Sequence, residues 1–98
     1  MAAESEPRNY QLISGVFTAD EANEILMTLF QDKISFHKRN ELSRRERFGE
    51  PDVAGQKRVA ELKKTKTDVA AMIEQARSSG QQLVINCTVE VTLSPMPR

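Results

Sequence analysis

The chain has 98 residues, of which 39% are hydrophobic and 29% charged, and its formal net charge at pH 7 is zero. This length suits one domain, and four phenylalanines, one tyrosine and no tryptophan allow only a thin core. No apolar run approaches the roughly 18–20 residues that span a bilayer. The acidic first residues lack the apolar stretch of a secretory signal, and the single Cys87 suits a reducing compartment, so we expect a cytoplasmic protein without a membrane segment.

The N-terminal part of the chain contains a clear helix start. Residues 1–8 are small and acidic and predict a disordered tail. Residues 10–14 predict a short extended segment, which Gly15 ends. Thr18 and Glu21 then have the spacing of a capping box, in which each side chain bonds the other residue's backbone N–H. The sequence therefore predicts a helix from about Ala19 to Leu42 or somewhat beyond.

Two stretches with heptad spacing predict a pair of long helices. Phe48–Asp52 contains a glycine and a proline and separates the two, so the second helix is expected from about Pro51 or Asp52 to Ser78. Two such helices joined by a short break fold back as an antiparallel, coiled-coil-like hairpin. The predicted seam is Ala22, Leu26, Leu29, Lys33, Phe36 and Asn40 on the first helix, and Val59, Leu62, Lys66, Val69, Ile73 and Ala76 on the second.

The segment 83–93 predicts a long C-terminal strand. Every second residue is apolar, and the residues between them are polar apart from Val84, which is typical of a strand with one dry and one solvated face. Residues 94–98 contain two prolines and predict a disordered tail. The apolar side of the strand is formed by Leu83, Ile85, Cys87, Val89, Val91 and Leu93.

These elements predict an α+β fold in one domain, residues 9–93, with a short N-terminal and a long C-terminal strand flanking the helical hairpin. Small sheets need three or more strands, or helix packing, to be stable. We therefore expect a homodimer in which strands pair between chains or hairpins form a four-helix bundle, with strand pairing favoured. The alternative is a monomer in which residues 10–14 pair with part of residues 83–93.

Polar residues within the predicted seams give a first candidate site. Lys33 and Lys66 fall within about one helical layer of each other in such a hairpin, and His37 lies four residues after Lys33 on the same face. The two ammonium groups would repel each other unless an anion lies between them, which suggests an anion site. The alternative is that both lysines extend to the rim of the seam and bury only their methylene groups.

The charges are unevenly distributed along the chain. Residues 33–66 contain eleven Lys or Arg and five Asp or Glu, a net charge of +6, and the remainder carries −6. The closed end of the predicted hairpin is therefore basic and suits an acidic protein surface or, as an alternative, a nucleic-acid backbone. A solvated surface of internal ion pairs, such as Glu41 with Arg45, is the simpler explanation. The candidate contact residues are Lys38, Arg39, Arg44, Arg45, Arg47 and Phe48.

No motif for a metal, a cofactor or a catalytic nucleophile occurs in the sequence. The main hypothesis is therefore a non-enzymatic assembly or adaptor protein that binds no cofactor, forms a homodimer and contacts an acidic partner through its basic tip. The alternative is a nucleic-acid-binding accessory protein that uses the same tip. A third hypothesis is an enzyme with a site between subunits around Lys33, His37 and Lys66.

Overall fold

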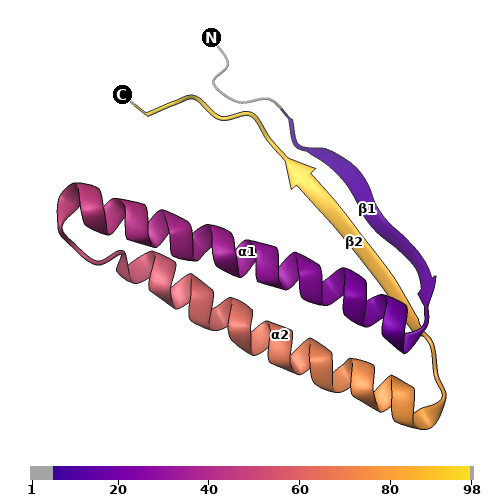
Figure 1. Ribbon diagram of the computed structural model, residues 1–98. Helices are drawn as coiled ribbons and strands as arrows, with labels where there is room; N and C mark the ends of the chain where they lie inside the picture. Colours follow the sequence, from indigo (N-terminus) through magenta and orange to yellow (C-terminus); the bar gives the residue numbers. More distant parts are fainter. Residues whose placement is uncertain (1–5, 98) are drawn as a thin grey trace. The chain divides into compact units, whose positions relative to one another are not determined.

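A computed structural model of the chain describes residues 6–97 and shows an α+β fold (Figure 1). Two helices pack together and two strands form an antiparallel sheet, as the sequence predicts. The contacts divide the chain into two compact units: the helical hairpin, residues 17–83, and the strand pair with the ends of the chain. The elements in chain order are β1 (Arg8–Phe17), α1 (Ala19–Phe48), α2 (Val53–Ser79) and β2 (Leu83–Val91).

Helix α1 begins at the predicted capping box. The backbone N–H of Glu21 donates to Thr18 Oγ1 at 3.1 Å, and the backbone N–H of Thr18 donates to Glu21 Oε1 at 2.9 Å. Two of the unpaired donors of the first turn are thereby satisfied. The helix ends where Gly49 adopts a left-handed conformation (φ 71°) and donates its N–H to the Arg45 carbonyl at 2.7 Å.

Helix α2 begins two residues after Pro51, because Asp52 acts as its N-cap. The Asp52 carboxylate accepts a hydrogen bond from the backbone N–H of Gly55 at 3.1 Å. At the other end, Gly80 adopts the left-handed conformation (φ 67°), and Gln81 donates its N–H to the Ala76 carbonyl at 2.9 Å. The helix therefore ends at Ser79, one residue beyond the predicted end.

Burial along α2 agrees with the predicted seam, whose six residues are all buried or half-buried. The predicted seam of α1 is wrong beyond Leu26, because Leu29, Lys33, Phe36 and Asn40 are exposed. The buried stripe lies one residue further along the chain and centres on Ile34, which is only 2% exposed. This stripe consists of Met27, Phe30, Ile34, His37 and Glu41.

An ion-pair cluster joins the helices at the open end of the hairpin. Arg77 of α2 donates to Glu74 Oε2 at 2.8 Å and also donates to the carboxylate of Asp20 at the start of α1. Hydrogen bonds to Glu74 and Asp20 raise the pKa of Arg77 further above its ordinary value. The cluster links the first turn of α1 to the last turn of α2.

The two strands pair within the chain. Strand β1 is longer than predicted, because it begins at Arg8, inside the predicted tail, and continues through Gly15 to Phe17. Residues 1–5 of the predicted tail lie outside the described residues. Strand β2 ends at Val91, so Leu93 follows the strand rather than belonging to it. Because the sheet has two strands only, one edge of each has no neighbouring strand in the described residues.

Each strand has apolar side chains on both faces of the sheet. Ser14 Oγ lies 3.4 Å from Asn86 Oδ1, so these two residues share one face. Since side chains alternate along a strand, the apolar side predicted for β2, which contains Ile85, lies on the opposite face. The face that contains Ser14 and Asn86, here called the Tyr10 face, also carries four apolar side chains: Tyr10, Leu12, Val16 and Val84.

Candidate functional site

The basic tip is the turn between α1 and α2 together with the adjoining helix ends. Phe48 is the last residue of α1 and is 61% exposed. The guanidinium carbons of Arg44 and Arg47 lie 5.8 Å and 5.4 Å from the centre of its ring, which is within cation–π range. The tip therefore presents an exposed aromatic ring close to two cationic groups.

Internal ion pairs occupy two of the five basic residues predicted at the tip. Arg45 donates to Glu41 Oε1 at 2.8 Å, and Arg44 lies 3.7 Å from Asp52 Oδ2. Within residues 6–97, the structure gives no ion pair for Lys38, Arg39 or Arg47. These three side chains are therefore not engaged by a carboxylate among residues 6–97 and can pair with one on a partner.

The exposed ring borders a small hollow at the turn. A hollow of about 300 Å³ is lined by Arg44, Phe48, Glu50 and Pro51. Aromatic and arginine side chains are the types most often found at the energetic centre of protein interfaces. The tip thus combines shape, an apolar ring and positive charge in one place.

The structure does not gather the three residues predicted to form an anion site. The Lys33 ammonium nitrogen lies 5.1 Å from the centre of the exposed Phe36 ring. The His37 ring is nearly perpendicular to the same ring, at 77°, and the centres of the two rings are 5.4 Å apart. Lys66 instead faces the other side of α1, where it donates to Gln31 Oε1 at 2.9 Å. The sequence prediction placed Lys33 on the wrong stripe of α1, together with Leu29, Phe36 and Asn40.

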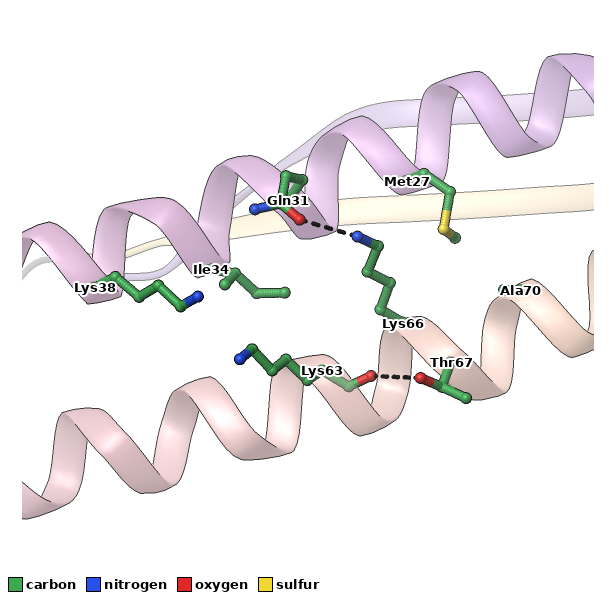
Figure 2. Close-up of a pocket in the computed structure, with 8 residues that line it drawn as sticks. All are labelled: Met27, Gln31, Ile34, Lys38, Lys63, Lys66, Thr67 and Ala70. Carbon is green, nitrogen blue, oxygen red and sulfur yellow. Dashed lines mark hydrogen bonds between the residues drawn. The ribbon is translucent and has the colours of Figure 1, made fainter.

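A different lysine cluster lies between the helices (Figure 2). A hollow of about 460 Å³ has three lysines in its lining, Lys38 of α1 with Lys63 and Lys66 of α2, and no carboxylate. This cluster is here called the lysine hollow. The sequence did not predict it as a site, although Lys66 was one member of the expected anion site. Its remaining lining residues are Met27, Gln31, Ile34, Thr67 and Ala70.

The Tyr10 face is the most exposed apolar surface of the strand pair. Its four apolar side chains are between 54% and 72% exposed. On the predicted dimer side of β2, by contrast, Ile85 is buried, Leu83 and Cys87 are half-buried, and Val89, Val91 and Leu93 are exposed. The sequence signal for this face was the spacing of Tyr10, Leu12 and Val16, which Ser14 interrupts.

The described residues contain no cluster of three or more His, Cys, Asp or Glu side chains suited to a metal ion. Cys87 is a free thiol. Across residues 6–97, neither helix has both the length and the apolar composition needed to cross a membrane.

Comparison with known proteins gives no relative, since no protein family, curated protein or solved structure matches the chain significantly.

Proposed function

We propose that the chain is a non-enzymatic assembly or adaptor protein, a cytoplasmic homodimer whose basic tip contacts an acidic protein partner. The observation that carries this proposal is the exposed Tyr10 face on a sheet of only two strands. The free thiol of Cys87 suits a reducing compartment such as the cytoplasm.

The Tyr10 face supports self-association because of its composition. A two-stranded ribbon is marginally stable in water, and covering an apolar face stabilises it by about 25 cal/mol for each Å² removed from water. Strand alternation assigns Arg8 and Glu90 to the Tyr10 face, and they are its charged residues in β1 and β2. Two copies of the face can therefore meet in an isologous contact without net charge repulsion.

The open edges of the sheet offer a second surface for the same partner. An unpaired edge presents N–H and C=O groups that another strand can bond, and Glu90 is the one charged residue of β2 available to discourage such pairing. A second copy of the chain can bind the sheet in two ways: through the Tyr10 face, or by adding a strand at an open edge. Dimerisation would place two basic tips on one particle, which is how a small adaptor gains avidity.

Light scattering on purified variants tests this dimer. Leu12→Lys puts a charge on the Tyr10 face, whereas Asn9→Lys puts the same charge on an exposed position of the opposite face of β1. We expect Leu12→Lys to give a monomer with unchanged helix content by circular dichroism, and Asn9→Lys to remain dimeric. Equal masses for the two variants would contradict an interface on the Tyr10 face.

An acidic partner for the tip is supported by its unpaired charges. Arg39 and Arg47 have no carboxylate partner among the described residues, and Arg47 also flanks the exposed ring of Phe48. A fluorescent polyglutamate peptide is a suitable probe. We expect Arg47→Glu to weaken its binding by about tenfold, since like charges brought together at an interface are strongly unfavourable. Lys64→Glu, which changes the same charge outside the tip, should have little effect.

Nucleic acid is the second candidate partner, because bases can stack on an exposed aromatic ring beside arginine. The same variants distinguish the two partners. The probe is a single-stranded DNA oligonucleotide. Nucleic acid is favoured over an acidic protein if this oligonucleotide binds more tightly than the peptide, if its binding falls steeply with salt, and if Arg47→Glu abolishes it.

A further inference from the structure

We propose that the lysine hollow binds an organic diphosphate. The hollow lies on the helical hairpin and shares only Lys38 with the predicted tip residues. Its function is therefore separate from dimerisation through the strand pair.

The lining of the hollow is cationic and lacks compensating carboxylates. Figure 2 shows the side chains of Lys38 and Lys63 extending from facing helices toward one another. Neither side chain has an ion pair with a described residue. Ammonium groups on flexible stems are well suited to binding phosphate as point charges. Three of them around one hollow favour a multiply charged anion, which would remove their mutual repulsion.

Lys66 is held at the edge of the hollow by a short chain of hydrogen bonds. Its ammonium group donates to Gln31 Oε1 at 2.9 Å, and Gln31 Nε2 donates to Ser35 Oγ at 3.3 Å. The Lys66 side chain is half-buried. An ammonium that is already positioned loses less conformational entropy when an anion binds.

The volume of the hollow and the apolar side chains at one of its ends indicate which class of ligand it can bind. A volume of about 460 Å³ falls in the range of small-molecule sites. One phosphate monoester carries a charge of about −1.5 to −2 at pH 7, which leaves part of the charge of three lysines unmatched, so a diphosphate fits better. Met27 and Ala70 lie at the end of the hollow away from Lys38 and Lys63 (Figure 2), where they suit an organic group.

Calorimetric titration with inorganic pyrophosphate, at an ionic strength held constant with sodium chloride, tests the diphosphate site. The test variant is Lys63→Gln, and the control is Lys57→Gln, which removes the same charge from α2 outside the hollow. We expect Lys63→Gln to weaken binding by about tenfold or more, as the loss of one charge-assisted contact implies. Lys57→Gln should stay within about twofold of the unmodified chain.

Two further ligands identify the organic group. Geranyl diphosphate and adenosine diphosphate share the phosphate chemistry but differ in the group that would lie against Met27 and Ala70. Tighter binding of either one than of pyrophosphate supports the site and identifies the source. Absence of pyrophosphate binding to the unmodified chain, equal loss in Lys57→Gln and Lys63→Gln, or weaker binding of both organic ligands than of pyrophosphate would overturn the proposal.

Discussion

His37 carries a buried nitrogen, Nε2, for which the described residues provide no hydrogen-bond partner. A buried polar group without a partner costs about 1–3 kcal/mol. We predict that His37→Leu raises the free energy of unfolding by about 1 kcal/mol, measured by urea denaturation. Asn40→Leu, at an exposed position one turn later, is the control and should change stability by less than about 0.5 kcal/mol. A loss of stability in His37→Leu would show that the imidazole has a partner in solution.

Helix propensity suggests that replacing Gly55 with alanine would raise the unfolding free energy, but we expect no such gain. A Cβ at this position would lie 2.5 Å from Asp52 Oδ2 and 2.9 Å from Asp52 Cγ, so the capping carboxylate would have to move. We predict that Gly55→Ala changes the unfolding free energy by less than about 0.5 kcal/mol, because a propensity gain of about 1 kcal/mol offsets a similar loss of the cap. Ala60→Gly, at an exposed position of the same helix, should cost about 1 kcal/mol. A full gain in Gly55→Ala would mean that the Asp52 cap contributes little.

Helix boundaries are well predicted from this sequence because they depend on local chemistry. Thr18 and Glu21 satisfy donors within three residues of each other, and Gly49 and Gly80 adopt the left-handed conformation that ends each helix. Removing the first cap should therefore destabilise the hairpin. We predict that Thr18→Ala lowers the unfolding free energy by about 1 kcal/mol in thermal or urea denaturation. Thr28→Ala, in the exposed middle of α1, should be neutral or slightly stabilising, and a similar loss in both variants would contradict the role of the cap.

The packing face of α1 was predicted less well, because α1 contains two apolar stripes. Leu29 and Phe36 continue one heptad pattern, and Met27, Phe30 and Ile34 continue a neighbouring one, so spacing alone does not choose between them. Helix α2 has one such stripe, and there the prediction agrees with burial. The lysine hollow was largely missed for the same reason: Lys38 and Lys63 face each other only when the correct stripe of α1 packs on α2.

The choice between the two stripes can be tested by truncation. Ile34 is 2% exposed, so Ile34→Ala should lower the unfolding free energy by about 2–4 kcal/mol. Leu29 is 39% exposed, and Leu29→Ala should cost clearly less. Urea denaturation of both variants measures the difference, and the reverse order would restore the seam predicted from the sequence.

In the sheet, pairing between two strands that are distant in sequence overrides the local preference of a residue. Gly15 predicts a break, but β1 continues through it because pairing with β2 extends the strand to Phe17. The prediction also missed that β1 directs Tyr10, Leu12 and Val16 to the face opposite Ile85. A pattern within one strand gives its own alternation, but the face it shares with a distant strand depends on register.

The proposed dimer follows from a strand pair that has more apolar surface than one chain covers. The most direct test is the mass of the unmodified chain by light scattering coupled to size-exclusion chromatography. We predict a particle of twice the chain mass of 11.1 kDa. A mass of 11.1 kDa that persists as concentration is raised would contradict it.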